Sequence, residues 1–261
     1  MKKAILIVSN GTSDIEALRT SIDKIEEKVR EEFKDYQLFR AFSSSRIISK
    51  LKEKYNIVVS TPEETLDYIE QQGFEELIVQ PLYILCGIEY EMLKNTVESF
   101  KTKSNLKKIV LGKSALVFGD EKRTFNFIES IKEVIPTDKP LVFMAHGTRS
   151  LSGICYEDLS ASFKAFGLNN IYIGAVEGTP SIYEIIKNLK KDKIKELILA
   201  PLLIVAGYHA KRDMASSIDT SWKSILQLEG FKVEVKLRGL GEIDDFHDFL
   251  INSIRESIKN K

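Results

Sequence analysis

Two of the three histidines in the chain stand at the ends of predicted strands, beside glycine residues. His146 ends the run LVFMAH and is followed by Gly147, and His209 comes two residues after Gly207, at the end of a longer apolar run. Glycine allows the backbone to turn tightly at such a point, so that each imidazole can face a cleft. Neutral imidazoles bind first-row divalent metals and also accept protons near neutral pH. The pair is therefore a candidate metal site or a candidate acid–base pair.

Two glutamates occupy related positions. Glu177 follows the predicted strand NIYIGAV in the second half, and Glu89 takes in the first half the place that His209 takes in the second. Parallel sheets bind ligands at the carboxyl ends of their strands, so we expect His146, Glu177 and His209 to converge on one edge. Two imidazoles and a carboxylate suit a divalent metal with open coordination positions. The simpler alternative is that both histidines are hydrogen-bonded turn residues.

The third histidine has a different setting. His247 lies on a predicted helix among Asp244, Asp245 and Asp248. A run of charged residues usually marks a solvated helix face, so we expect His247 to be exposed.

An internal repeat organises the chain. Three segments of the first half have counterparts in the second: EELIVQPLYILCGIEYEM (75–92) with KELILAPLLIVAGYHAKRDM (195–214), AILIVSNGT (4–12) with LVFMAHGT (141–148) and, more loosely, FRAFSS (39–44) with IGAVEG (173–178). In the first pair, matched residues such as Leu77 and Leu197 are 120 positions apart. The second pair places Asn10 opposite His146. Such a repeat predicts a duplicated α/β unit.

Strands alternate with helices of ten to twenty residues, which is typical of parallel sheets covered on both faces. Local signals place several helices: a capping-box pattern at Ser13 and Glu16, a cap and first helical position at Thr61 and Pro62, and an apolar spacing at Met214, Ile218 and Trp222. The predicted fold class is α/β, with two similar lobes that are each a parallel sheet flanked by helices.

The stretch PTDKP at 136–140 falls where the pattern restarts. We therefore predict an N-terminal α/β lobe at 1–136 and a C-terminal α/β lobe at 137–261, the second of which carries the metal site. The last helix, from about 243 to 258, could swap across to pack on the other lobe.

Composition argues against several function classes. Lysine and arginine (38 residues) balance aspartate and glutamate (38 residues), which leaves no bulk field to hold nucleic acid or an anionic membrane. The two cysteines lack metal-finger spacing, and a disulfide framework is not expected. The sequence has neither a signal-peptide core nor the ~20 apolar residues of a membrane span, so we expect a cytoplasmic protein. Glycine-rich nucleotide loops and a serine-hydrolase elbow are also missing, and no nucleotide cofactor is expected.

Short motifs along the whole chain give these residues a family context. They are VSNGTS, LFRAFSS, TPEETL, GIEYE, VFMAHG, GAVEGTP, AGYHAKRDMAS, SWK and RGLGE. Together they resemble the class II tetrapyrrole chelatases with a ferrochelatase-like fold, and in particular the anaerobic sirohydrochlorin cobaltochelatase family. The resemblance implies an active site in the cleft between two α/β lobes. It also implies a metal held by His146, Glu177 and His209, with Glu89 as a further acidic residue facing them.

The resemblance further implies the activity. Members of this family insert Co2+ into sirohydrochlorin, a lyase-type reaction of anaerobic cobalamin and porphyrin biosynthesis that releases two protons and consumes no nucleotide. His146 and Glu89 would then be the catalytic residues. Donors to the carboxylates of sirohydrochlorin could come from Asn10, Ser43, Ser44, Arg46 and Lys211. Nucleic-acid and membrane partners are not expected, and a homo-oligomer is compatible with the sequence.

Three other interpretations use the same residues. Insertion of iron or nickel into sirohydrochlorin or a related tetrapyrrole needs the same ligand types, because ligand softness does not separate Co2+ from its neighbours. A non-catalytic carrier of a tetrapyrrole or a metal would also need them. A two-lobed small-molecule binding protein would share the duplicated architecture, although metal-type residues at strand ends argue against it.

Overall fold

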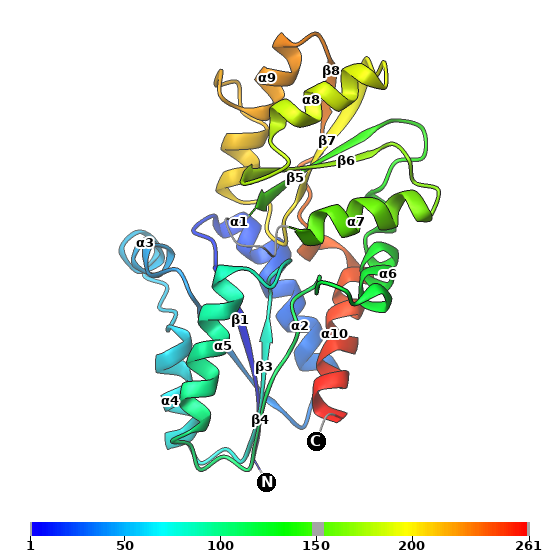
Figure 1. The fold of residues 1–261 in the computed structure, drawn as a ribbon. Helices are drawn as coiled ribbons and strands as arrows, with labels where there is room; N and C mark the ends of the chain where they lie inside the picture. Colours follow the sequence, from blue (N-terminus) through cyan, green and yellow to red (C-terminus); the bar gives the residue numbers. More distant parts are fainter. Residues whose placement is uncertain (1, 148–153, 260–261) are drawn as a thin grey trace. The chain divides into compact units, whose positions relative to one another are not determined.

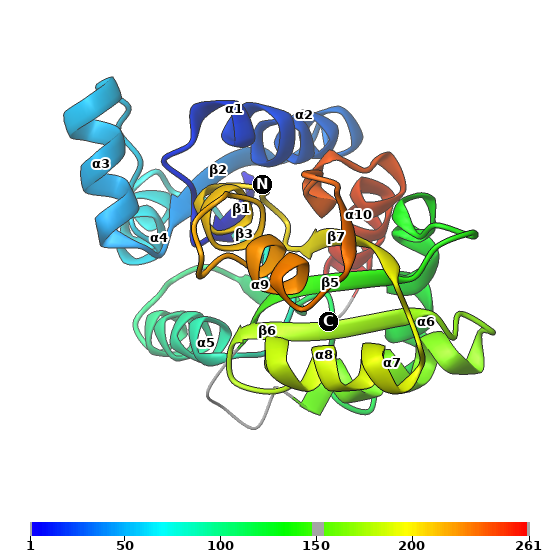
Figure 2. The same cartoon turned by 90° about the horizontal axis from the view of Figure 1, so that it is seen from above.

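The computed structural model describes residues 2–147 and 154–259, which contain two four-stranded parallel sheets with helices packed against them (Figures 1 and 2). By their internal contacts the residues form two compact units. The first unit comprises Met1–Val117 and His247–Lys261, and the second comprises Phe118–Phe246.

The first unit is built on a parallel sheet with the strand order β2-β1-β3-β4. Its elements before the last helix are β1 (Lys3–Ser9), α1 (Ile15–Ala17), η1 (Leu18–Ile22), α2 (Asp23–Glu32), β2 (Gln37–Phe42), α3 (Ser45–Tyr55), α4 (Pro62–Gln71), β3 (Glu76–Pro81), α5 (Ile88–Lys101) and β4 (Lys108–Leu111). Leu6 and Val79 of the sheet share one apolar cluster with Leu66 of α4 and Val97 of α5. Burial of this cluster fixes α4 and α5 on one face of the sheet.

The second unit repeats the arrangement with the order β6-β5-β7-β8. Its elements are α6 (Glu121–Ser130), η2 (Lys132–Val134), β5 (Leu141–Gly147), α7 (Ile154–Ala165), β6 (Ile171–Glu177), α8 (Ile182–Lys191), β7 (Glu196–Leu202), η4 (His209–Met214), α9 (Trp222–Leu228), β8 (Lys232–Val235), η5 (Leu240–Glu242) and the start of α10 (Asp244–Lys259). Met144 and Leu199 of the sheet lie in one apolar cluster with Ile186 of α8 and Leu226 of α9. The two sheets thus confirm the predicted duplicated α/β class.

Strand registers confirm two of the three repeat alignments. Ile5 of β1 pairs with Ile78 of β3, and their predicted counterparts, Leu141 of β5 and Ile198 of β7, pair with each other. Matched residues therefore occupy equivalent places in the two sheets.

The third alignment is displaced by one residue. Ser9 pairs with Phe42, and its counterpart Ala145 pairs with Ala175, whereas matching FRAFSS to IGAVEG would align Phe42 with Val176. Successive side chains of a strand point to opposite faces, so a shift of one residue reverses every orientation. The loose similarity of these two segments contains too little pattern to define the register.

One predicted helix start is confirmed and another is corrected. Thr61 accepts a hydrogen bond from the Glu64 N–H at 3.3 Å, and the Glu64 carboxylate accepts from the Thr61 N–H at 2.9 Å, which completes a capping box. At the first helix the predicted cap Ser13 is wrong, because Asp14 accepts from the Ala17 N–H at 3.1 Å. Ala17 is three residues beyond Asp14, the spacing that an N-cap requires.

The single helix predicted through Met214, Ile218 and Trp222 is also wrong. A π-helical segment ends at Met214, Ile218 lies in a turn, and α9 begins at Trp222. Ser221 caps α9 by accepting from the Ser224 N–H at 3.1 Å. A serine that bonds the backbone in this way favours a new helix start over continuation of the old one.

The unit boundary differs from the predicted division into 1–136 and 137–261. Helix α6 belongs to the second unit, where Phe125 lies against Phe166, just beyond α7, with ring centroids 5.0 Å apart. The break therefore precedes α6, because aromatic packing joins this helix to the unit that follows it in sequence.

Helix α10 belongs to the first unit from His247 onward, as the expected swap requires. Within that unit, Nη2 of Arg255 lies 2.6 Å from Oε2 of Glu32 on α2.

The prediction that His247 is exposed is wrong, since only 6% of its surface is accessible. His247 shares a stripe with the buried Leu250 and Ile254, and this helical spacing outweighs the neighbouring aspartates.

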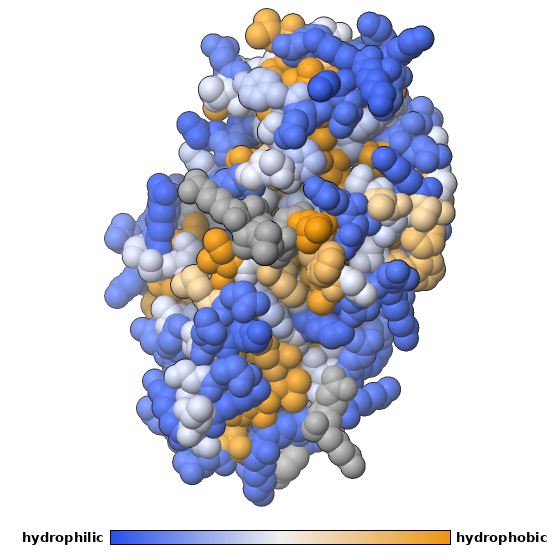
Figure 3. All heavy atoms as spheres, viewed as in Figure 1, coloured by the Kyte–Doolittle hydropathy of each residue, from blue (hydrophilic) through white to orange (hydrophobic). Residues whose placement is uncertain are grey.

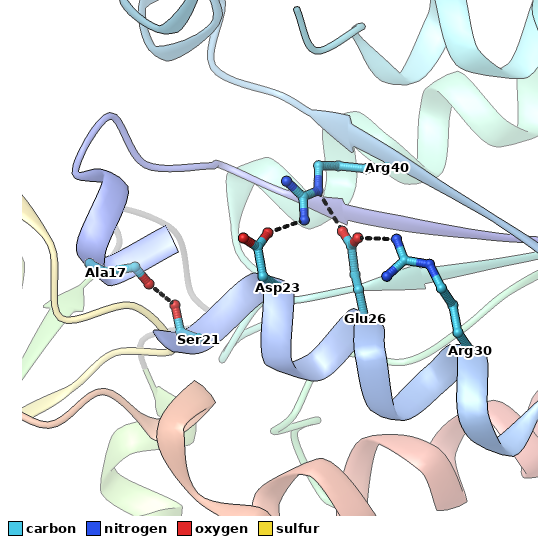
Figure 4. Close-up of polar contacts among 6 residues, drawn as sticks. All are labelled: Ala17, Ser21, Asp23, Glu26, Arg30 and Arg40. Atoms are coloured by element: carbon cyan, nitrogen blue, oxygen red, sulfur yellow. Dashed lines mark hydrogen bonds and ion pairs between the residues drawn. The ribbon is translucent and has the colours of Figure 1, made fainter. Parts of the chain in front are cut away.

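A charged network holds α2 against β2 in the first unit (Figure 4). Glu26 is 1% exposed and accepts hydrogen bonds from Arg40 Nε at 2.6 Å and from Arg30 Nη2 at 3.0 Å, while Arg40 also pairs with Asp23. Burial by itself would lower the pKa of Arg40, but hydrogen bonds to Glu26 and Asp23 and their charges outweigh it and raise that pKa. The buried carboxylate is thus paired, as a charge in the interior must be. Nearby, the Ser21 hydroxyl donates to the Ala17 carbonyl within the same helical segment.

Polar and charged residues cover most of the surface in view in Figure 3, interrupted by smaller apolar areas. None of the described helices is long and apolar enough to cross a membrane. Three exposed apolar side chains lie close in sequence to predicted site residues: Ile88 (50% exposed), Met92 (65%) and Tyr208 (59%).

Candidate metal and substrate site

The second unit brings the two predicted imidazoles together. His146 is the penultimate residue of β5, and His209 is the first residue of η4, which follows the neighbouring strand β7. Their ring centroids are 5.1 Å apart, and their planes are inclined by 31°. The prediction that these two histidines meet at the carboxyl edge of one sheet is confirmed.

Gly147 allows the chain to leave β5 beside this pair. Its φ is +88°, and a Cβ atom at this position would lie 1.8 Å from the carbonyl oxygen of Glu177 on β6. Gly11, the counterpart of Gly147, has a φ of +79°, and a Cβ there would lie 2.5 Å from the ring of Phe42. Only glycine fits so close an approach, which explains why each unit has one at this turn.

Asp213 orients the His209 ring. Its Oδ2 atom lies 2.7 Å from Nδ1 of His209, one turn away on η4, and its Oδ1 atom lies 3.3 Å from Nη1 of Arg212. A carboxylate at Nδ1 selects the tautomer with its proton there and leaves the lone pair of Nε2 available to a ligand. Sequence analysis missed Asp213, although its spacing of four residues from His209 was a usable signal.

His146 has an unsatisfied nitrogen. Its Nδ1 atom is buried and has no hydrogen-bond partner in the described part of the chain. Buried polar atoms are nearly always paired, so such an atom at a strand end indicates a partner supplied by a ligand or metal. The donor set therefore fits a divalent first-row metal, for which imidazole is a preferred ligand.

Glu177 ends β6 and pairs in register with Gly147, and its side chain is exposed. Among the described residues, no three histidine, cysteine, aspartate or glutamate side chains are grouped closely enough to hold a metal together. The structure therefore brings two of the three predicted ligands together, and the role of Glu177 stays a prediction.

The first unit gathers predicted site residues at the equivalent sheet edge. Asn10 and Ser43 directly follow β1 and β2, and the Ser43 hydroxyl lies 2.8 Å from the Asn10 Oδ1 atom. Tyr83, which sequence analysis did not single out, donates to Ser43 Oγ at 3.1 Å. Glu89 is half-buried in the first turn of α5. Burial, and to a smaller extent the charge of Glu89, raise the pKa of Tyr83 to about 12. Glu89 therefore lies within electrostatic range of the Tyr83 hydroxyl.

The remaining predicted substrate residues lie at or within helical segments of the two units. Ser44 is the N-cap of α3 and accepts from the Ile47 N–H at 3.4 Å, so its side chain has a structural role. Arg46 on α3 and Lys211 on η4 are exposed.

Solved structures define the class to which this fold belongs. A structure of SirB from Bacillus subtilis with Fe3+ matches with a TM-score of 0.65 at 15% identity and covers 100% of this chain and 97% of SirB. CbiX, described as the terminal enzyme for biosynthesis of siroheme in denitrifying bacteria, matches with a TM-score of 0.57 at 16% identity, over 98% of this chain and 99% of CbiX. The duplicated parallel α/β unit is thus the chelatase fold.

Sequence comparison identifies the family within that class. The family model described as cobalt chelatase (CbiK) matches residues 3–259, and the chain belongs to this family. A sirohydrochlorin cobaltochelatase of Salmonella typhimurium is 31% identical over 245 residues, which cover 93% of this chain and 91% of the relative. The sirohydrochlorin cobaltochelatase CbiKC of Nitratidesulfovibrio vulgaris is 28% identical over 262 residues, covering 98% and 91%. The resemblance noted from the motifs is confirmed.

Proposed function

We propose that the protein catalyses insertion of Co2+ into sirohydrochlorin without nucleotide hydrolysis, as a chelatase of cobalamin biosynthesis. The observation that supports this proposal most directly is the His146–His209 pair, with ring centroids 5.1 Å apart, in a member of the cobalt chelatase family. We place the reaction in the cytoplasm, with sirohydrochlorin as the partner and no nucleic acid or membrane required.

The imidazole pair would supply the metal. Asp213 holds the His209 ring so that Nε2 presents its lone pair, and His146 offers a second imidazole 5.1 Å away between centroids. We assign Glu177 as the third ligand, on its place at the end of the neighbouring strand. Two or three protein ligands leave coordination positions open, so that water on the metal can be exchanged stepwise for pyrrole nitrogens. A closed four-ligand cage would hold the ion too tightly for transfer.

Metal insertion must also remove two pyrrole protons. We assign Glu89 and His146 to this step, because a carboxylate and a neutral imidazole can both accept a proton. Glu89 also contributes negative charge that attracts the incoming cation. Bending of the macrocycle would expose the nitrogen lone pairs, driven by binding energy from its carboxylate periphery.

Substrate binding would combine polar and apolar contacts. Sirohydrochlorin is a flat polycarboxylate, and Asn10, Ser43, Arg46 and Lys211 offer donors to its carboxylates. Ile88, Met92 and Tyr208 are exposed and adjoin Glu89 or His209 in sequence or on the same helix turn. We assign Ile88 and Met92 to apolar contacts with the macrocycle, because both are exposed on the same unit beside Glu89.

Anaerobic steady-state assays test the proposal. Insertion rates should be measured for Co2+, Fe2+ and Ni2+, each with sirohydrochlorin and with protoporphyrin. Conversion of sirohydrochlorin well beyond one equivalent per chain, fastest with Co2+, is expected. Conversion that stops at one equivalent would indicate a carrier, and faster insertion of Fe2+ or Ni2+ would reassign the metal.

A further inference from the structure

A chain of hydrogen bonds joins three strand ends in the first unit. Tyr83, two residues beyond β3, donates to Ser43 Oγ at 3.1 Å, and Ser43 Oγ lies 2.8 Å from Asn10 Oδ1. Asn10 follows β1, and Ser43 follows β2. Since β1 lies between β2 and β3, the chain spans three adjacent strands at their carboxyl ends.

Each step of this hydrogen-bond chain has a donor and an acceptor. Tyr83 is 8% exposed, and burial raises the pKa of its phenol to about 12, so the hydroxyl keeps its proton and donates it. Ser43 then accepts with its oxygen and has one proton of its own to give. Asn10 Oδ1 is the nearer acceptor at 2.8 Å, whereas the Ser9 carbonyl is 3.3 Å away and already accepts from the Ser43 N–H at 2.9 Å. The serine proton therefore goes to Asn10.

The chain sets the orientation of the Asn10 amide. With Oδ1 engaged as an acceptor, the amide must present its NH2 group, and neither Nδ2 hydrogen has a partner among the described residues. An amide with the opposite orientation would present its oxygen and repel an anion. A fixed NH2 group, by contrast, offers two donors to an acceptor-only group such as a carboxylate.

On this basis, and resting on the proposed function, we infer that Asn10 binds a carboxylate of the tetrapyrrole through Nδ2, and that Tyr83 is the positioning residue that holds the amide in this orientation through Ser43. Asn10 occupies in the first unit the place that His146 occupies in the second. The duplicated unit thus uses one strand end for the metal and its counterpart for the substrate periphery.

Binding of metal-free sirohydrochlorin, followed by absorbance, tests the inference without metal insertion. Tyr83→Phe removes only the hydroxyl and keeps the ring in its apolar cluster. Loss of this one hydrogen bond should weaken binding and raise KM by about 3- to 10-fold, with kcat and Co2+ affinity unchanged. Asn10→Asp keeps the shape but replaces the NH2 group by a charged oxygen, and should weaken binding more. Because the residues act as one chain, the double variant should bind little worse than Asn10→Asp alone.

Tyr172→Phe is the matched control. Tyr172 donates to Asp192 Oδ2 at 2.7 Å near the start of β6, away from the carboxyl ends of the strands, so its loss should leave binding and KM unchanged. A methyl ester of sirohydrochlorin should bind the parent more weakly and reduce the difference between the parent and Tyr83→Phe.

Two outcomes would overturn the inference. Parent-like binding of sirohydrochlorin by both Tyr83→Phe and Asn10→Asp would remove Asn10 from the binding site while leaving the proposed function intact. Equal losses from Tyr83→Phe and Tyr172→Phe would reduce Tyr83 to a general structural role. Failure of the parent protein to bind or convert sirohydrochlorin would instead contradict the proposed function itself.

Discussion

The Nδ1 atom of His209 lies 2.7 Å from the Oδ2 atom of Asp213, one turn further along the same π-helical segment. Such a segment is uncommon and is frequently found at functional sites. The contact leaves Nε2 as the nitrogen that can bind a ligand.

Asp213→Ala should therefore lower Co2+ affinity. Carboxylates that orient a metal-binding histidine typically account for 10- to 100-fold of affinity, and we expect a loss of about 10-fold here because the side chain is partly exposed. Calorimetric titration with Co2+ measures it, with circular dichroism to confirm folding. Parent-like affinity would show that His209 does not need this partner.

Replacement of either paired histidine should abolish most insertion. His209 is exposed and His146 is half-buried, so His146→Ala and His209→Ala should change the melting temperature little. His247→Asn is the control, because His247 is buried in α10 and should affect melting temperature and leave kcat unchanged. Near-full activity of either alanine variant at saturating Co2+ would remove that histidine from the metal site.

Substitutions of Glu89 and of His209 should have different effects, since the repeat gives the two residues equivalent positions but different chemistry. Glu89→Gln keeps the shape and removes the charge, so turnover should slow while Co2+ binding to the protein alone weakens little. His209→Asn should instead act mainly on metal binding and lower the affinity of the protein for Co2+. Co2+ affinity and insertion rate are measured for both. If Glu89→Gln loses metal binding as completely as His209→Asn, then Glu89 is a primary ligand and the assignment of Glu177 is wrong.

The buried network around Glu26 should matter for stability. Arg40→Ala removes the donor at 2.6 Å from a carboxylate whose side chain is only 2% exposed, and breaking such a pair costs about 3 kcal/mol in the free energy of unfolding. The exposed pair Lys24–Glu27 is the matched comparison on the same helix, and Lys24→Ala should make no measurable difference. Urea unfolding of both variants measures the two changes in the free energy of unfolding. Equal effects would mean that Arg30 alone satisfies Glu26.

Alkaline pH should test the protonation of Tyr83. Burial is the main cause that raises the pKa of Tyr83 to about 12, whereas a phenol in the unfolded chain titrates near 10. Because the folded pKa is the higher one, the protonated phenol contributes stability that is fully present below about pH 10 and is lost as pH rises through about 12. The difference in unfolding free energy between the parent and Tyr83→Phe should stay constant up to pH 10 and shrink above it. A constant difference up to pH 11.5 would contradict this ionisation.

Local patterns were sufficient to predict the duplicated fold and the histidine pair. The 120-residue offset between Leu77 and Leu197 relates two buried strands, β3 and β7, of 6 and 7 residues, and buried strands have few alternative registers. Glycines next to His146 and near His209 mark strand ends, and the carboxyl ends of neighbouring parallel strands must lie at one edge. Strand length, glycine position and chain direction are properties of short segments, so they can be inferred before the fold is known.

Tertiary structure alone decided the burial of His247 and the Tyr83–Ser43–Asn10 chain. The aspartates around His247 indicate a solvated face, and only the packing of α10 on the first unit shows that its histidine side is covered. The hydrogen bonds of Ser43 reach Asn10 and Tyr83 across separations of 33 and 40 residues. Such contacts depend on strand order and register, and a shift of one residue would turn Ser43 to the other face of the sheet. The sequence contains these three side chains, but only the assembled sheet brings their polar atoms within hydrogen-bonding distance.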